Sequence, residues 1–231
     1  EPRFADLLRR VSATGIERIR FATSHPKDLN DDVINAFGEL DNLMPALHLP
    51  VQSGSNAILK AMHRRYTREH YLEIIKKLRE VRPDIALSTD IIVGFPGETE
   101  KDFQQTYDLI KEVGYTQVFT FIYSKREGTP AARMEDDTPR EVIQERFERL
   151  VDLVQERALE VNQVEVGKVI PVLVEGVSKR DETVLMGRSP KNLTVHAPIP
   201  EGVFIEDLQG TIINVRVDFA RAWYLRGQVV S

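Results

Sequence analysis

Residues 88–100, STDIIVGFPGETE, carry an apolar run into a glycine–proline turn and then into the start of a helix. The β-branched residues Ile91–Val93 are typical of a strand that is buried on both faces. Thr99 and Asp102 have the spacing of a capping box, which predicts that a helix begins after Thr99. Because ligands of α/β proteins bind beyond the carboxyl ends of the strands, the polar residues of this turn are candidates for a binding site.

The same alternation of apolar runs and amphipathic stretches continues through the first part of the chain. Repeated strand–helix units predict a parallel sheet with right-handed crossovers, either open or part of a barrel. Thr138–Glu141 combines an N-cap, a proline at the first helical position and a capping-box glutamate, which predicts a long helix to about residue 162. The expected strands are residues 18–22, 47–51, 85–93 and 117–123, and the expected helices are residues 5–13, 30–40, 56–80 (broken near 64–67) and 100–113.

After Gly167 the helical periodicity ends, and short β-rich runs are separated by Gly, Pro, Ser and Asn. This pattern predicts a small antiparallel barrel of about 65 residues, a size near the lower limit for independent folding. We therefore expect two domains, residues 1–164 and residues 165–231. The expected strands of the second domain are residues 169–174, 183–186, 210–217 and 223–230.

Composition limits the possible functions. The 231 residues are 42% hydrophobic and 29% charged, with a formal net charge of -5, so the chain has no global nucleic-acid signature. No run of eighteen apolar residues and no signal-peptide pattern occurs, so we expect a cytoplasmic protein with no membrane partner. The sequence holds no cysteine, which excludes disulfides, thiolate catalysis and cysteine-held metal clusters within this chain. The five histidines lack metal-ligand spacing, and we assign none of them to a metal: His25, His48, His63, His70 and His196.

Four polar clusters follow the expected strands of the first domain. Strand-to-helix loops are polar in most proteins, so any one cluster has about even odds of having no ligand to bind. Four such clusters at the same edge of a sheet favour a binding site. They are residues 23–26, 52–55, 90–98 and 124–129.

Three segments, in this order and spacing, resemble the middle of a radical S-adenosylmethionine (SAM) methylthiotransferase. They are LHLPVQSGS (47–55), MHRRYT (62–67) and TDIIVGFPGET (89–99). Residues 18–26 and 123–131 extend the resemblance, and residues 167–230 resemble the small RNA-binding TRAM barrel that ends these enzymes. The resemblance implies an incomplete radical SAM partial TIM barrel, with about four parallel β/α units, followed by a small all-β, OB-like TRAM barrel.

Within this family, residues 20–26 and 49–55 are most similar to the branch that methylthiolates isopentenyladenosine at position 37 of tRNA, next to the anticodon. The resemblance implies that this chemistry uses a 5'-deoxyadenosyl radical to remove the hydrogen from C2 of the adenine. The branch acting on threonylcarbamoyladenosine is the first alternative. A non-catalytic RNA-binding module is the second, and a different radical enzyme, such as a coproporphyrinogen oxidase relative, is the third.

The resemblance assigns the cofactor S-adenosylmethionine to Gln52, Ser53, Arg64 and Asp90. Arginine can pair bidentately with the methionyl carboxylate, aspartate can accept hydrogen bonds from ribose hydroxyls, and glutamine can donate and accept at once. For Arg64 the alternative is a solvated cation on a helix surface beside Arg65, which is the commoner position of arginine. Asp90 is flanked by apolar strand residues, where a carboxylate without partners is costly to bury.

Further residues are candidates for substrate binding. Arg126 and Thr129 follow the last expected strand of the first domain and would shape the floor of the substrate pocket. Trp223 and Phe204 could stack on bases, but in so small a barrel we expect core roles for them first. That barrel carries as many acidic as basic residues, so an RNA site on it must be a one-sided patch. The cations expected to contact RNA phosphates are Lys179, Arg180, Arg188 and Lys191.

The chain departs from the family in its lack of cysteine. The resemblance implies two [4Fe-4S] clusters, one held by a Cys-x-x-x-Cys-x-x-Cys loop and one by three cysteines of an N-terminal domain. We therefore expect a fragment that holds no catalytic residue and no metal ligand, is inactive alone, and associates or aggregates through an open sheet edge. The implied partners are the missing N-terminal region, a tRNA anticodon stem-loop and a sulfur donor.

Overall fold

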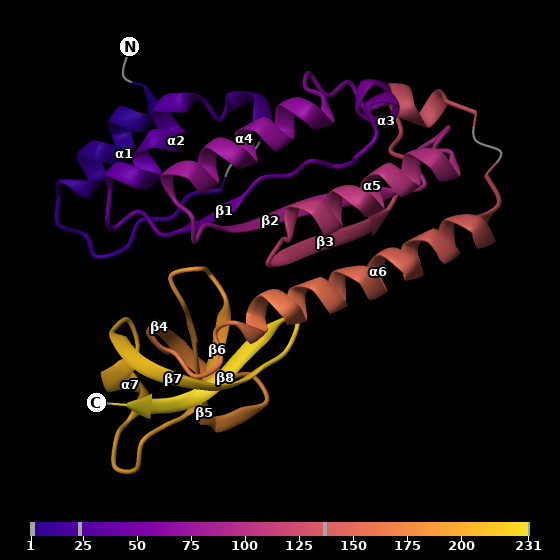
Figure 1. Ribbon diagram of the computed structural model, residues 1–231. Helices are drawn as coiled ribbons and strands as arrows, with labels where there is room; N and C mark the ends of the chain where they lie inside the picture. Colours follow the sequence, from indigo (N-terminus) through magenta and orange to yellow (C-terminus); the bar gives the residue numbers. More distant parts are fainter. Residues whose placement is uncertain (1–2, 23–24, 136–137, 231) are drawn as a thin grey trace. The chain divides into compact units, whose positions relative to one another are not determined.

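The computed structural model describes residues 3–22, 25–135 and 138–230. It divides into two compact units, one up to Val154 and one from Gln155 onward (Figure 1). This division falls within helix α6 (Arg140–Gln163), which confirms the predicted long helix. Among the described residues, no helix is both long and apolar enough to cross a membrane.

The first unit contains a parallel sheet with helices packed against it. Its strands are β1 (Ala46–His48), β2 (Ala86–Val93) and β3 (Gln117–Ile122), in the order β1-β2-β3. Strand residues such as Leu47 and Ile91 belong to one hydrophobic cluster with helix residues such as Tyr71 and Leu109. The helices are α1 (Phe4–Ser12), α2 (Asp31–Glu39), α3 (Asn56–Ala61), α4 (Arg68–Val81) and α5 (Glu100–Val113), with short 3-10 turns at Pro26–Asp28 and Pro130–Arg133.

The strand predicted over residues 18–22 is reduced to an isolated bridge between Ile19 and Leu43. The Ile19 N–H donates to the Asn42 carbonyl at 2.7 Å, but the Ala46 N–H turns back onto the Met44 carbonyl, also at 2.7 Å. The groups that would extend the pairing are therefore used in a local turn. The described sheet has three strands in place of the four expected.

Strand β2 alternates between its two faces, so the prediction of burial on both faces is wrong. Thr89, Ile91 and Val93 point into the core, whereas Asp90 and Ile92 are half-buried on the opposite face. The partners of Asp90 and Ile92 in β3 are Phe119 and Phe121, which are 41% and 50% exposed. This second face is less covered because it borders a cavity.

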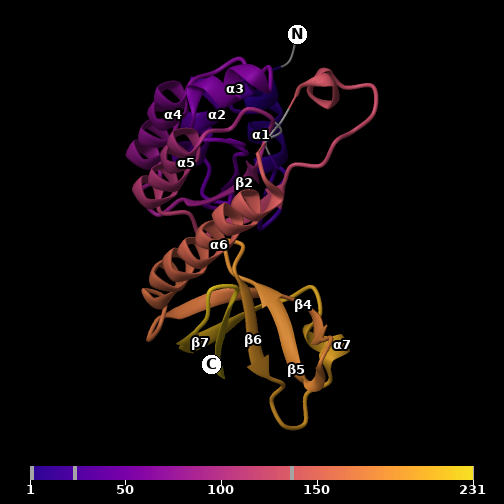
Figure 2. The same cartoon turned by 90° about the vertical axis from the view of Figure 1, so that its right-hand side faces the viewer.

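The second unit is a closed five-stranded barrel, which confirms the expected OB-like architecture. Its strands are β4 (Val169–Ser178), β5 (Asp181–Arg188), β6 (Thr194–Pro198), β7 (Ile212–Ala220) and β8 (Tyr224–Val230), in the order β4-β5-β6-β8-β7, with the short helix α7 (Ile205–Leu208) before β7. Sequence patterns missed β6, and the barrel is not wholly antiparallel because β6 pairs with β8 in parallel. Figure 2 shows the barrel strands from a second side.

Candidate cofactor-binding site

A cavity of about 530 Å³ lies where the strands of the first unit reach their carboxyl ends. Its volume is within the usual range for small-molecule sites. The cavity brings together five residues that the sequence singled out, although they come from four separate segments. They are Gln52, Arg64, Asp90, Arg126 and Thr129, and the remaining lining is Ile92, Phe121, Ile122, Tyr123, Ser124 and Ala131.

Asp90 lies in the middle of β2 with its carboxylate 27% exposed. The Nε2 atom of His48 lies 3.5 Å from this carboxylate, and the Nδ1 atom of His48 lies 3.0 Å from the Ser88 hydroxyl. His48 is thus a hydrogen-bonded strand residue. A carboxylate has about four acceptor positions, so Asp90 retains capacity for hydroxyl donors from the cavity.

Gln52 has a left-handed backbone, with φ at 73°. Its N–H donates to the Asp90 carbonyl at 2.9 Å, and its own carbonyl accepts from the Ile92 N–H at 3.0 Å. A residue other than glycine costs about 1–3 kcal/mol in such a conformation, and conformations of this kind cluster at functional sites. The two backbone bonds hold Gln52 in this conformation beside β2.

A turn, and not a helix surface, places Arg64 at the cavity. His63 is left-handed, with φ at 58°, and its N–H donates to the Lys60 carbonyl at 3.0 Å. The Arg64 N–H donates to the Leu59 carbonyl at 2.8 Å, which completes a Schellman motif at the end of α3. Arg64 is half-buried and lines the cavity, whereas Arg65 is exposed. This placement argues against the alternative of a solvated surface cation.

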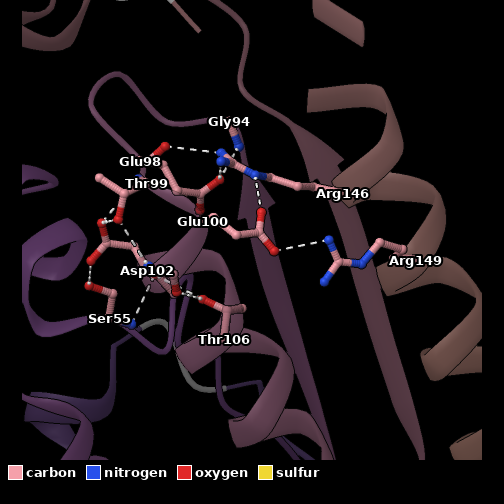
Figure 3. A network of polar contacts seen from close by, with 10 residues as sticks. Ser55, Gly94, Glu98, Thr99, Glu100, Asp102, Thr106, Arg146 and Arg149 are labelled. Atoms are coloured by element: carbon pink, nitrogen blue, oxygen red, sulfur yellow. Dashed lines mark hydrogen bonds and ion pairs between the residues drawn. The ribbon is translucent and has the colours of Figure 1, made fainter. Parts of the chain in front are cut away.

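Ser53 is fully buried and does not line the cavity. Its hydroxyl lies 3.2 Å from the Thr106 hydroxyl on α5, which also accepts a 2.8 Å bond from the Gly54 N–H. The Ser55 hydroxyl donates to Asp102 at 2.5 Å, and Asp102 forms the predicted capping box with Thr99 (Figure 3). The loop that presents Gln52 is therefore bonded to the first turns of α5.

Gly54 lies against the backbone of α5. A Cβ atom at this position would overlap the carbonyl oxygen of Gln105 and lie 2.6 Å from the Cα of Thr106. Real Cβ contacts are essentially never this short. Only glycine therefore lets the loop and the helix meet at this distance.

The remaining predicted residues of the first unit have clear positions. The Thr129 hydroxyl donates to the Arg126 carbonyl at 2.8 Å and caps the short helical turn that follows. Thr23 and Ser24 lie outside the described residues. The His25 ring packs edge-on against Tyr66, with ring centroids 5.1 Å apart, and away from the cavity lining.

A buried ionic network next to the cavity strand was missed by the sequence analysis. Glu98 is 3% exposed and accepts a 2.8 Å bond from the Gly94 N–H. Arg146 of α6 lies 3.8 Å from the Glu98 carboxylate and 2.9 Å from that of Glu100, which also pairs with Arg149 (Figure 3). Burial raises the pKa of Glu98 to about 7, because desolvation outweighs the Gly94 bond and the Arg146 charge. The only sequence feature that pointed to Glu98 was its position in the turn after β2.

Glu98→Gln is expected to flatten the dependence of stability on pH. The pKa of Glu98 is about 7 in the folded state against an ordinary 4.5, so the folded state binds more protons between these values. The contribution of Glu98 to the free energy of unfolding is fully present below pH 4.5 and is lost as the pH rises to about 7. Urea unfolding between pH 4.5 and 8 measures the slope. Glu100→Gln is the control, because the pKa of Glu100 is lowered and its contribution has the opposite sign. An unchanged slope in Glu98→Gln would contradict the assignment.

The barrel cations predicted to contact RNA do not lie together. Lys179 and Arg180 lie at the turn between β4 and β5 and line a groove of about 960 Å³. Arg188 lies 3.4 Å from the Glu175 carboxylate and is not among the residues that line this groove. Trp223 and Phe204 are 46% and 72% exposed, so the prediction that they lie in the core is wrong.

Lys191 already has a buried partner. It lies 2.8 Å from the carboxylate of Glu165, which is 6% exposed and also lies 3.3 Å from Lys168. Burial alone would raise the pKa of Glu165, but the two lysines outweigh burial and lower it. The proposed phosphate contact of Lys191 therefore competes with this ion pair.

Comparison with known proteins identifies the families of the two domains. Residues 1–110 match the family model of the radical SAM superfamily, and residues 163–230 match the TRAM domain. The chain therefore contains a radical SAM domain and a TRAM domain. The chain resembles the radical SAM enzyme coproporphyrinogen III oxidase of Escherichia coli, with a TM-score of 0.54 and 16% identity over 66% of this chain and 37% of that one. This likeness concerns the fold.

Curated relatives match nearly the whole chain. The tRNA-2-methylthio-N(6)-dimethylallyladenosine synthase of Alkaliphilus oremlandii is 52% identical over 99% of this chain and 48% of its own length. The synthase of the same name from Acetivibrio thermocellus is 48% identical over 98% of this chain and 46% of its own length. The chain thus spans about half the length of the curated relatives it matches.

A radical SAM domain implies S-adenosylmethionine and an iron–sulfur cluster as cofactors. The sequence holds no cysteine, and the described residues include no group of three metal-ligating side chains. The cavity suits the organic cofactor, because it combines the Arg64 cation, the Asp90 acceptor and the backbone-strained Gln52. These residues would hold S-adenosylmethionine, and other residues would have to hold the cluster.

Proposed function

We propose that the chain is part of a tRNA methylthiotransferase that converts N6-isopentenyladenosine, next to the anticodon, to its 2-methylthio derivative. The isopentenyl group is the dimethylallyl group in the name of the relatives. The observation that carries the proposal is the convergence of Gln52, Arg64 and Asp90 on one cavity in a chain about half identical to those synthases. A branch that acts on threonylcarbamoyladenosine is the competing function.

The residues of the cavity have distinct roles in this proposal. Arg64 binds the methionyl carboxylate, Asp90 accepts hydrogen bonds from the ribose hydroxyls, and Gln52 bonds the cofactor from the neighbouring strand end. Bound S-adenosylmethionine supplies the radical chemistry that acts on C2 of the adenine. Arg126 and Thr129, which also line the cavity, orient the substrate base.

The proposal also names partners. Two [4Fe-4S] clusters would be held by cysteines of an N-terminal region that works with this chain, and a sulfur donor would supply the transferred sulfur. A tRNA anticodon stem-loop would contact the TRAM barrel, in keeping with the tRNA named in the relatives. We propose residues 1–164 as the radical SAM part and residues 165–231 as the RNA-binding part.

Nucleoside analysis tests this function. The chain is assayed alone and joined to the part of the Alkaliphilus oremlandii synthase that it does not match, after iron–sulfur reconstitution. Each protein is incubated with S-adenosylmethionine and tRNA carrying either isopentenyladenosine or threonylcarbamoyladenosine, and digested tRNA is analysed by mass spectrometry. We expect 2-methylthio product from the joined protein on the first tRNA alone. Product on the second tRNA only would establish the competing function, and turnover by the chain alone would refute the need for a second region.

A further inference from the structure

We propose that the groove over β5, β6, β8 and the adjoining end of β7 binds unpaired RNA by stacking bases on Phe219, Trp223 and Tyr224. The inference rests on the proposed function, which makes a tRNA loop the partner of the barrel. It differs from the cation-based prediction because it assigns the affinity mainly to aromatic rings. The evidence is the groove of about 960 Å³ and the side chains around it.

The groove lies on the face that OB-type barrels use for oligonucleotides. In such barrels the second and third strands and the turns after the first and fourth strands form the binding surface. Here those elements are β5, β6 and the turns between β4 and β5 and between β7 and β8. The lining comes from all four, including Met186 on β5, His196 on β6, Lys179 in the first turn and Trp223 in the second.

Aromatic rings are concentrated along this groove. Trp223 is 46% exposed and Phe219 is 40% exposed, although both are large apolar side chains. Tyr224 packs edge-on against His196, with ring centroids 5.5 Å apart. Stacking of a base on such a ring contributes about 1–3 kcal/mol and tolerates any base. The rings therefore offer a platform for bases that are not stacked in a duplex.

The turn that carries Trp223 is held in place before any ligand binds. The side-chain amide of Asn162, which is fully buried, donates to the carbonyls of Arg221 and Ala222 at 2.9 and 3.0 Å. The Arg221 N–H also donates to the Tyr224 carbonyl at 2.8 Å. The buried side chain thus fixes the backbone before the tryptophan, and the Arg221–Tyr224 backbone bond closes the turn around it. Such preorganisation lowers the entropy cost of binding.

Cations accompany the rings and favour a polyanion over an apolar protein partner. The guanidinium of Arg226 lies 5.7 Å from the Tyr224 ring centre, and that of Arg221 lies 5.1 Å from the Phe219 ring centre. Burial, with the charges of Arg226 and Arg188, lowers the pKa of His196 and keeps its ring neutral near pH 7.

Two acidic side chains of the lining are already engaged. The Asp181 carboxylate accepts from the N–H and hydroxyl of Thr183 at 2.9 and 2.6 Å, and Asp218 accepts from the Gln228 amide at 3.4 Å. The cations of the lining are Lys179, Arg180 and Arg226. Three phosphate contacts predict a slope of about -2 for log affinity against log salt concentration, which is shallow for a nucleic-acid site.

Trp223 makes the test direct, because it is the sole tryptophan of the sequence. The intact chain is titrated with a short single-stranded RNA and with a duplex of the same sequence. Tryptophan emission is followed, and the anisotropy of labelled RNA is measured in parallel. We expect saturable quenching by the single strand, the same dissociation constant from both signals, and much weaker binding of the duplex.

Variants separate stacking from other contacts. Trp223→Ala and Tyr224→Ala should each weaken binding about 5- to 150-fold, and Trp223→Phe should retain most of it because a stacking ring remains. Phe204→Ala is the matched control, since this exposed aromatic residue lies outside the groove lining. Far-UV circular dichroism checks that every variant is folded.

Three results would overturn the inference. They are RNA binding with no change in tryptophan emission and no loss in the variants, equal binding of duplex and single strand, and no binding of either RNA. The nucleoside assay is independent of these signals. If the joined protein carrying Trp223→Ala forms product at the normal rate, and that rate depends on tRNA concentration as it does without the substitution, the proposed function stands and the stacking site is refuted.

Discussion

Gly54→Ala is expected to destabilise the first unit by about 3 kcal/mol, the upper end for overpacking, because the added methyl group meets backbone atoms. A neighbouring side chain could rotate away from the added methyl group. The Gln105 carbonyl and the Thr106 Cα, however, belong to the backbone of α5 and can move only with the helix. We expect the melting temperature to fall on the order of 10 °C. The helical circular dichroism signal during heating measures this change.

A second glycine provides the control for backbone strain. Gly97 has φ at 83°, but nothing lies within 4 Å of a Cβ placed there. Gly97→Ala should therefore cost only the strain of a left-handed alanine, about 1–2 kcal/mol. If the two variants melt at the same temperature, close packing of the 52–55 loop on α5 is not what requires glycine at position 54.

Arg64→Ala is expected to weaken binding of S-adenosylmethionine by about 30- to 150-fold in the joined protein. This range corresponds to about 2–3 kcal/mol, the usual contribution of hydrogen bonds to a charged group. The loss follows from the place of Arg64 at the cavity, where it would pair with the methionyl carboxylate. Equilibrium dialysis with radiolabelled cofactor measures the dissociation constant.

Arg65→Ala is the matched control for charge. Arg65 is the next residue, is exposed, and does not line the cavity. Its removal should change the dissociation constant less than twofold, since exposed charges contribute little at physiological salt. Equal losses in the two variants would show that general positive charge, and not the placement of Arg64, governs cofactor binding.

Local patterns were sufficient to predict most of the helices and the outline of the barrel. Thr99 with Asp102 located the start of α5, and the break near residues 64–67 appears between α3 and α4. These features depend on residues close in sequence, which propensities and caps describe well. The same patterns missed β6, a strand of five residues containing a proline and a histidine.

The candidate site was harder to predict because distant segments form it. The resemblance pointed to Gln52, Arg64 and Asp90, but no sequence pattern indicates the left-handed backbone of Gln52 or His63. Glu98 and Arg146 lie 48 residues apart and meet only through the packing of α6. Trp223 was assigned to a core because tryptophan is usually buried, whereas the tertiary fold leaves it exposed.

At position 52 the residue that would make the fold most stable differs from the residue that could bind a ligand through its side chain. Glycine would adopt the observed φ of 73° without steric cost, so selection for stability alone would favour glycine there. Glycine has no side-chain amide to offer a ligand. Glutamine at this position therefore lowers the stability of the fold, and under the proposed role of its side chain a stabilising Gln52→Gly change is expected to weaken cofactor binding.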